Sequence, residues 1–368
     1  MGGSIQQQRR FGGCLVNGGL LLLVLLWTVP TLGLFISSFR TREDIQTSGW
    51  WNVFPHRDWQ TVAVINVNEL GLDTSGTMEI EGVTGTFEDF RAGVITGEDR
   101  RLTWVGNRRL GRVEVQEQVW TVDWGFTLDN YSQVLSGKDF VYTRPDGTEE
   151  TIPGDDFVSA FLNSLAVAIP ATVIPILVAA FAAYGFAWMR FPGRRLLFIM
   201  VVALLVVPLQ ISLVPILGDF RQLAINGTFL AMWLAHTGFG LPLATYLLFN
   251  YISTLPRETL ESAFIDGASH FTVFRRLILP LSVPALASFA IFQFLWVWND
   301  YLVALIFLGG NPETKVITQR LADIVGSRGN DWHLLTAGAF ITMLLPMIVF
   351  FSLQRFFVRG LLAGSVKG

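Results

Sequence analysis

The sequence predicts an all-α polytopic membrane protein with six transmembrane helices, plus a β-rich insert between the first two helices. The first observation is composition: 51% of the 368 residues are hydrophobic, 15% are charged, and the mean hydropathy is +0.48. Such a chain is too apolar for an ordinary soluble domain of this size. The second is spacing. Six apolar windows reach the roughly 20 residues that a helix needs to cross a bilayer: 18–39, 157–189, 196–217, 229–249, 284–308 and 334–356.

The first apolar window follows Arg9 and Arg10, an arrangement that secretory leaders share. Its apolar stretch is long, however, and the run "GLFISSFRTRED" offers no small-x-small cleavage site. We therefore expect an uncleaved anchor, in which residues 1–39 form an N-terminal segment and the first transmembrane helix.

The distribution of basic residues predicts the orientation of the chain. Lys and Arg near membrane ends are retained on the cytoplasmic side. With the N-terminus inside, the cytoplasmic segments hold eleven Lys and Arg residues, and the short outside loops hold four. The opposite orientation would reverse this bias, so we expect both termini to lie in the cytoplasm.

Residues 40–156, called the insert below, form the one stretch long enough for a soluble domain, and the orientation places them outside the cytoplasm. They contain 21 of the 29 Asp and Glu residues. The runs "TVAVINV", "TMEIEGVTGTF", "RLTWVG" and "GRVEVQEQVWTV" alternate apolar and polar residues, which is typical of half-buried strands. We expect a β-rich domain over about 50–123. It is either a solvated cap on the first two helices or a docking surface for a partner on that side.

No run of the sequence has the pattern of a catalytic or metal site. The chain has no His-Glu-x-x-His pair and no Gly-x-Ser-x-Gly elbow, and its four histidines lie in separate segments. The run "SGKDF" lacks the earlier glycine of a phosphate-binding loop. The single cysteine, Cys14, excludes an internal disulfide. We expect no enzyme activity, no cofactor, no metal and no nucleic-acid partner.

The segment between the fourth and fifth windows, about 254–283, is charged and bracketed by prolines. Thr254 is predicted to cap a helix whose first turn contains Pro256, where the missing N–H costs nothing. Gly267 is predicted to end this helix, and Ser269 to cap the next one. The orientation above places the segment in the cytoplasm.

Small residues at Ala263 and Gly267 leave part of this helix without large side chains, so another surface can approach its backbone closely. The alternative is a helix lying on lipid headgroups, which usually carries Lys or Arg on its polar face. Here the polar face carries Glu258, Glu261 and Asp266. A protein groove is therefore the expected partner.

The run "ESAFIDGASHFTVFRRLILP" resembles the EAA loop of permease subunits in ATP-binding-cassette (ABC) importers, with the pattern Glu-Ala-Ala, three residues, Gly, nine residues, Ile-x-Leu-Pro. The matching positions are Glu261, Ala263, Gly267, Leu279 and Pro280, whereas Ser262 replaces the second position and Leu277 the isoleucine. The runs "FTLDNYSQVL", "FLNSLAVA", "VPLQISLVPI", "WVWNDYLVAL" and "QRFFVRGLLAGSVKG" are similar to the sugar-specific branch, with its smaller maltose permease and α-glucoside permeases. The resemblance covers residues 18–39 and 126–368.

The resemblance implies a permease of a bacterial or archaeal inner membrane, with a transmembrane domain over 157–368. It implies four kinds of partner: a second permease, two cytoplasmic ATPase subunits that bind the ATP, an external solute-binding protein and a sugar of the α-glucoside, maltose or trehalose type. It also implies that the tail 354–368 touches the ATPase. The residues expected to couple the chain to the ATPase are Glu258, Glu261, Ser262, Ala263, Asp266, Gly267, Leu279 and Pro280.

Sugar recognition needs amides and carboxylates beside aromatic faces, and polar groups within membrane spans mark pathways because exposing them to lipid is costly. The alternative use of such residues is hydrogen bonding between helices, or an aromatic belt at the membrane surface. The candidates for a sugar pathway are Asn163, Ser164, Gln293, Trp296, Asn299 and Asp300.

Two other functions stay open from the residues alone. Asp300 in the fifth window could relay protons in a proton-coupled secondary transporter, although no second Asp or Glu and no Lys or Arg lies deep in another window. A membrane sensor could use the insert as a receptor domain, and it would need a cytoplasmic signalling domain. An importer permease is the expected function.

Overall fold

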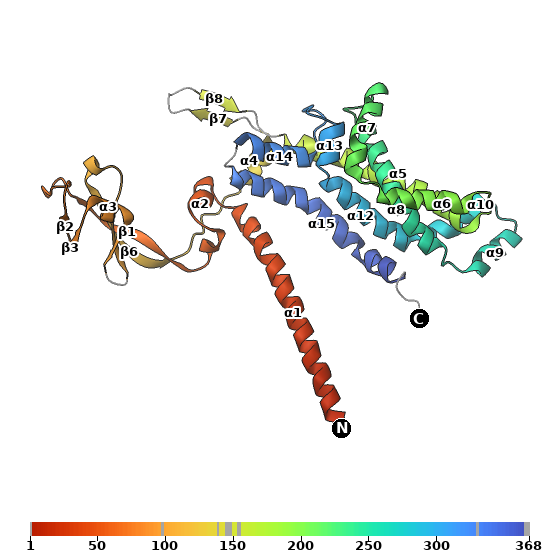
Figure 1. The fold of residues 1–368 in the computed structure, drawn as a ribbon, viewed down its shortest axis with the longest axis horizontal. Helices are drawn as coiled ribbons and strands as arrows, with labels where there is room; N and C mark the ends of the chain where they lie inside the picture. Colours follow the sequence, from red (N-terminus) through yellow and green to blue (C-terminus); the bar gives the residue numbers. More distant parts are fainter. Residues whose placement is uncertain are drawn as a thin grey trace. The chain divides into compact units, whose positions relative to one another are not determined.

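The computed structural model describes residues 2–96, 99–137, 140–143, 149–152, 156–328 and 331–363. The chain divides into two compact units, Met1–Phe126 and Thr127–Gly368, and each is described by itself (Figure 1). The end of the C-terminal tail, for which contact with an ATPase is expected, lies outside the described residues.

Unit 1 begins with the long apolar helix α1 (Gly2–Ser37). Two short helices follow: α2 (Arg42–Thr47), whose first turn is capped by Thr41, and the 3-10 turn η1 (Trp50–Val53). The buried Arg40 guanidinium holds α2 next to the end of α1, because it donates to the carbonyl oxygens of Asp44 at 2.9 Å and Ser48 at 3.1 Å.

The rest of unit 1 contains a four-stranded antiparallel sheet of order β1-β6-β5-β4. Its strands are β1 (His56–Asn66), β4 (Val94–Thr96), β5 (Arg100–Trp104) and β6 (Arg112–Thr121). The hairpin β2 (Met78–Ile80) and β3 (Val83–Gly85) and the helix α3 (Phe87–Ala92) complete it. The four alternating runs of the sequence lie over β1, β2–β3, β5 and β6.

Alternation along β6 separates the two faces of this sheet. Val113 and Val115 are fully buried and pack with Phe90 and Leu102, whereas the Glu114 carboxylate lies on the opposite face. There it accepts hydrogen bonds from Thr61 Oγ1 at 2.8 Å and Arg112 Nη2 at 2.9 Å. The hydrogen bond from Thr61 is the largest cause that lowers the pKa of Glu114 below its usual value.

Unit 2 is a bundle built on four long helices. They are α5 (Phe157–Trp188), α8 (Phe229–Ile252), α12 (Val283–Asn299) and α15 (Trp332–Ala363). α5 packs along α8 and α12, and α12 packs on α15 (Figure 1). Shorter elements surround them: α4 (Asp129–Ser136), the hairpin β7 (Phe140–Thr143) and β8 (Glu149–Ile152), α13 (Leu302–Phe307) and α14 (Ile317–Arg328). α13 lies within the predicted window 284–308, and the other short elements were not predicted.

The predicted window 196–217 is not one continuous helix. It contains α6 (Arg194–Ala203), the 3-10 turn η3 (Leu204–Val206) and α7 (Leu209–Gln222), and the chain bends by 104° between the two helical parts. Pro208 causes the break because it cannot donate to the preceding turn, and it holds Val207 in an extended conformation, with ψ 119°. The window 284–308 is likewise divided, since α12 ends at Asn299 and α13 starts at Leu302.

Among the described residues, three helices are long and apolar enough to cross a membrane: 12–37, 157–188 and 332–356. Two bent pairs, 194–222 and 270–299, raise this number to five if each pair is one span. α8 is 24 residues long but is not in that set. The six-helix count therefore stays a prediction.

Candidate functional site

The segment between α8 and α12 starts with the helix α9 (Arg257–Ile265). The predicted cap at Thr254 is wrong. Pro256 is the residue that flanks the helix, and no side chain caps its first turn. Thr254 lies too far upstream, and its hydroxyl instead donates to the Tyr251 carbonyl oxygen at 2.7 Å, in the last turn of α8.

Gly267 ends α9 as predicted, through a Schellman motif. The Gly267 N–H donates to the Phe264 carbonyl oxygen and the Ala268 N–H to the Ala263 carbonyl oxygen, both at 3.0 Å. Gly267 has φ +83°, which residues other than glycine rarely adopt. A Cβ there would meet no atom within 4 Å, so the backbone conformation requires the glycine and crowding within the chain does not.

Three short elements carry the chain from α9 to α12: α10 (His270–Val273), a π-helical turn η4 (Phe274–Ile278) and α11 (Leu279–Leu281). Ser269 caps α10 by accepting from the Thr272 N–H at 3.2 Å, which confirms that predicted cap. Leu279 is half-buried beside the core, and Pro280 is exposed in α11.

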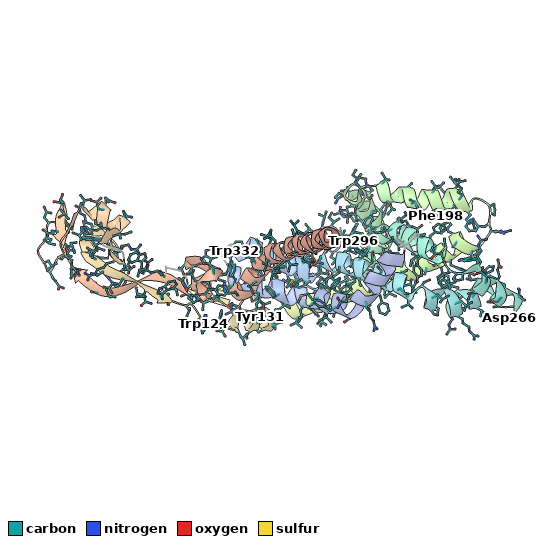
Figure 2. The ribbon with its side chains drawn as sticks, turned by 90° about the horizontal axis from the view of Figure 1, so that it is seen from below. Trp124, Tyr131, Phe198, Asp266, Trp296 and Trp332 are labelled. Atoms are coloured by element: carbon teal, nitrogen blue, oxygen red, sulfur yellow. The ribbon has the colours of Figure 1, made fainter. Side chains whose placement is uncertain are left out.

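α9 has one buried face and one exposed face. Leu260 is fully buried and packs in a core cluster with Ile252 and Ile278. The exposed face carries the predicted coupling residues Glu258, Glu261, Ser262, Asp266 and Gly267, with Ala263 half-buried beside them. Figure 2 shows Asp266 at the end of this loop.

Two large apolar side chains, one before and one after Gly267 in the sequence, are exposed. Ile265 is 85% exposed and Phe271 is 63% exposed. Sequence reasoning missed both, although Ile265 is an apolar residue outside the buried Leu260 face of α9, and Phe271 is an apolar residue of the next helix, α10. We name the surface formed by Glu261, Ile265, Asp266, Gly267 and Phe271 the loop tip.

An aromatic contact connects the loop tip to α5. The Tyr184 hydroxyl lies 2.8 Å from His270 Nδ1, and the Phe264 ring stands edge-on to His270 at 4.9 Å between centroids. Phe274 stacks on Phe181 at 4.1 Å. Because Phe181 and Tyr184 belong to α5, the loop is attached to the bundle by side chains as well as by its ends.

Three of the predicted pathway residues form hydrogen bonds with main-chain groups: Asn163, Ser164 and Asp300. Asn163 Nδ2 donates to the carbonyl oxygens of Glu313 at 2.8 Å and Lys315 at 3.0 Å. Ser164 Oγ accepts from the first N–H of α14 at 2.8 Å, and Asp300 Oδ1 accepts from the Val303 N–H in α13 at 2.9 Å. These contacts correspond to the alternative role expected for such residues, which is hydrogen bonding within the protein and not contact with a sugar.

The other three pathway candidates lie on α12. Gln293 is buried, and its Nε2 donates to the carbonyl oxygens of Ala171 in α5 at 3.1 Å and His236 in α8 at 3.2 Å. Trp296 is 37% exposed and stands edge-on to the His236 ring at 5.6 Å. Asn299 is exposed, and its Nδ2 donates to the Leu295 carbonyl oxygen at 2.7 Å.

Two buried polar side chains on the helices that Gln293 contacts, α5 and α8, were missed by sequence reasoning. His236 is fully buried, and neither of its ring nitrogens has a hydrogen-bond partner among the described residues; the buried hydroxyl of Thr172 has none either. We name Thr172, His236 and Gln293 the central polar cluster. A histidine inside an apolar window was the available signal for it.

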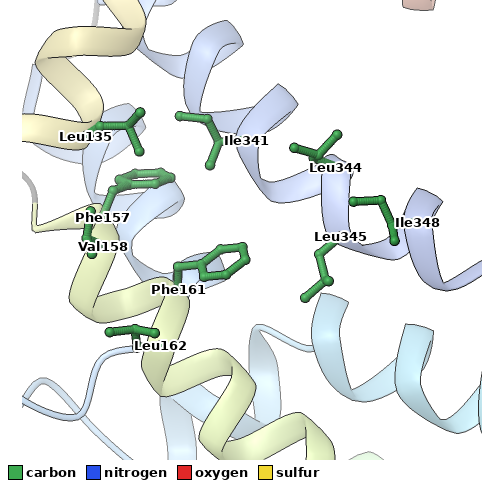
Figure 3. Close-up of a pocket in the computed structure, with 9 residues that line it drawn as sticks. All are labelled: Leu135, Phe157, Val158, Phe161, Leu162, Ile341, Leu344, Leu345 and Ile348. Carbon is green, nitrogen blue, oxygen red and sulfur yellow. The ribbon is translucent and has the colours of Figure 1, made fainter.

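A groove of about 360 Å³ lies between α4, α5 and α15, and apolar atoms form almost all of its surface (Figure 3). It offers no hydroxyl-matching group and is therefore unsuited to a sugar. Its lining residues are Leu135, Phe157, Val158, Phe161, Leu162, Ile341, Leu344, Leu345 and Ile348. Within the described part of the chain, no three His, Cys, Asp or Glu side chains are grouped so that they could hold a metal ion.

Residues 161–362 match the family described as "Binding-protein-dependent transport system inner membrane component". The chain belongs to this family. The predicted identification as an importer permease is confirmed, and the matched residues include both the loop tip and the central polar cluster. This permease is thus an inner-membrane component with several apolar helices.

Curated relatives match the permease over nearly its whole length. It is 48% identical over 352 residues to the osmoprotective compounds uptake permease protein GgtD of Synechocystis sp., covering 96% of this chain and 91% of that protein. It is 47% identical over 385 residues to the alpha-glucoside transport system permease protein AglG of Rhizobium meliloti, covering 96% and 97%. A crystal structure of a bacterial ABC transporter that imports alginate matches 64% of this chain and 81% of that chain, at 19% identity and a TM-score of 0.49.

Proposed function

We propose that this permease forms half of the translocation pathway of an ATP-driven importer for sugars of the α-glucoside type. The loop tip carries the proposal: a short exposed helix end with acidic and apolar side chains, attached to the bundle and matching the EAA pattern. The alpha-glucoside permease, which is 47% identical, supports the sugar class. A second permease, two ATPase subunits and a solute-binding protein complete the importer.

The loop tip is proposed to sit in a groove of the ATPase. Ile265 and Phe271 would bury their side chains there, and Glu261 and Asp266 would face basic groups at its rim. Closure of the ATPase dimer would then move α9 as a rigid piece. The contact of Tyr184 with His270 would pass this movement to α5, because packed aromatic groups do not deform continuously.

Gly267→Trp tests the groove. A large side chain at the loop tip should leave the protein in the membrane but uncouple ATP hydrolysis from uptake. Both rates are measured with the reconstituted importer. The matched control is Gly309→Trp, because Gly309 has φ +70° and a Cβ there would also meet no atom within 4 Å. Equal uptake by the two variants at equal expression would exclude the groove.

The chain is proposed to cross the membrane six times with both termini in the cytoplasm and the insert outside. The eleven-to-four bias of Lys and Arg between the two sets of segments supports this orientation. A cysteine at the exposed Ser75, with Cys14 replaced by serine, should react with an impermeant thiol reagent in intact cells. Protection of this cysteine until lysis would contradict the topology.

The sugar pathway is proposed to pass Trp296 and Asn299, with the central polar cluster behind them. The contacts of Asn163, Ser164 and Asp300 favour a supporting role for these three. Exposed Trp296 could stack on a sugar ring, and it shields His236, whose ring nitrogens have no partner among the described residues. Trp296→Ala should raise the sugar concentration for half-maximal uptake at least about tenfold, whereas Trp296→Phe should keep it within about threefold.

Reconstitution separates an ATP-driven importer from a proton-coupled carrier. Uptake should require the ATPase and the binding protein, and it should be indifferent to an uncoupler. A proton gradient that drives uptake by the isolated chain would support the carrier instead.

A further inference from the structure

Large aromatic side chains gather at one end of unit 1 with most of their surface in solvent. Trp51 is 61% exposed, Phe54 51%, Trp124 69% and Phe126 51%. We name these four residues the aromatic collar. They come from two segments far apart in the sequence, one before β1 and one after β6.

The first segment is folded back along α1. The Trp50 indole packs on Gly33, where a Cβ would lie 2.6 Å from Trp50 Nε1. Gly33 is four residues before the end of α1 at Ser37, which corresponds to about 6 Å along the helix axis. η1, with Trp51 in it and Phe54 directly after it, therefore lies beside the last turn of α1.

The second segment is attached to the same place. Trp124 Nε1 donates to the Val53 carbonyl oxygen at 2.8 Å, and the Asp123 N–H donates to the Asn52 carbonyl oxygen at 3.0 Å. Phe126 forms an isolated bridge with Arg40, just past the end of α1. Figure 2 labels Trp124 at the base of the sheet.

The aromatic collar continues the apolar surface of α1. Leu22 and Leu26 of this helix are 60% and 61% exposed, so no described part of unit 1 covers its length. Tryptophan has an apolar ring and one N–H donor, and it is enriched where hydrocarbon meets headgroups. Next along the sheet, Arg57 and Asp99 form an ion pair, and Trp120 opposite Arg57 on β6 is also exposed.

We propose that the aromatic collar lies in the headgroup region of the bilayer at the end of α1, and holds the base of the sheet against the membrane surface. The partner is lipid: the collar is continuous with a membrane-crossing helix and has aromatic composition. Four exposed aromatic side chains in one contiguous patch would otherwise remain in water. This proposal is independent of the sugar and of the loop tip.

Nitroxide labels on the full chain, in the assembled importer in lipid nanodiscs, test the depth of the collar. With Cys14 replaced by serine, single labels at Trp51→Cys and Phe126→Cys sample its two segments. Leu26→Cys in α1 and Val62→Cys in β1, which is 52% exposed, are the matched controls. The measurement compares collisions with oxygen, which concentrates in lipid, and with a water-soluble nickel complex.

Both collar labels should give a depth between those of Leu26→Cys and Val62→Cys. A collar label as accessible to nickel as Val62→Cys would place the collar in water and overturn the proposal. Shielding from both reagents would mean that a protein covers the collar, and would overturn it equally. Normal uptake by the labelled proteins shows that the substitutions leave the fold intact.

Discussion

The loop tip and the central polar cluster both contain polar groups in a largely apolar bundle, but they use them in opposite ways. At the loop tip, Glu261 and Asp266 are exposed beside the exposed Ile265. In the cluster, Gln293 directs its amide to the backbones of α5 and α8. A change in the cluster should therefore affect folding, and a change at the tip should affect coupling while the fold survives.

The largest effect is expected from Gly240→Val in α8. A Cβ at Gly240 would lie 2.5 Å from Gln293 Oε1, so the amide of the buried Gln293 must move, and we expect its hydrogen bonds to α5 and α8 to be lost. The expected cost is about 3 kcal/mol or more. The measurement is the thermal midpoint of the purified protein. Gly238→Val is the control, since a Cβ there meets no atom within 4 Å, and an equal loss in both variants would contradict the account.

Leu260→Ala and Ile265→Ala separate the two faces of α9. Leu260 is 0% exposed, so its truncation should cost about 2–5 kcal/mol of stability. Ile265 is 85% exposed, so its truncation should change stability by less than about 0.5 kcal/mol. The second variant should nevertheless lose most coupled uptake. Normal coupling in a fully stable Ile265→Ala protein would remove that residue from the proposed interface.

A smaller effect is expected where the loop meets α5. Tyr184→Phe removes the hydroxyl that contacts His270 and keeps the ring, at a cost of about 1 kcal/mol. If the contact transmits movement, ATP hydrolysis should continue with reduced uptake per ATP. Tyr246→Phe in α8 is the control. An unchanged ratio of uptake to hydrolysis would leave the contact with a structural role alone.

The smallest effect concerns Asp156, which caps α5 by accepting from the Ser159 N–H at 3.0 Å. Hydrogen bonds from Ser159 lower the pKa of Asp156 below its usual 3.8. A depressed folded-state pKa gives stability that is present above 3.8 and is lost as the pH falls through the folded value. Asp156→Asn should therefore cost under about 1 kcal/mol at about pH 6, and the difference should shrink below pH 3.8. A difference that does not change with pH would contradict this role.

The sequence was most informative where a local backbone rule applies. Gly267 and Ser269 were assigned correctly because a helix end needs a left-handed residue and a side-chain cap. Thr254 is also a residue type that commonly caps helices, but Pro256 is the residue that flanks the start of α9. Local rules identify candidates, and the start of a helix among several candidates depends on the preceding helix as well.

Contacts between distant segments could not be predicted. Ser164 accepts from the first N–H of α14, 153 positions along the chain, and no periodicity indicates such a pairing. Composition placed His236 in an apolar window, but its position beside Gln293 depends on how α5, α8 and α12 pack. The bend after Val206 was missed for a different reason, because hydropathy averages over Pro208, and prolines also lie inside continuous helices such as α5.

The central claim is that the loop tip contacts the ATPase, and site-specific photocrosslinking tests it most directly. A photoreactive residue at Ile265 is compared with one at Val206, because these side chains are 85% and 83% exposed in the same unit. In the assembled importer, the Ile265 probe should crosslink to the ATPase and the Val206 probe should not. No ATPase crosslink from Ile265, or equal crosslinking from both positions, would contradict the account.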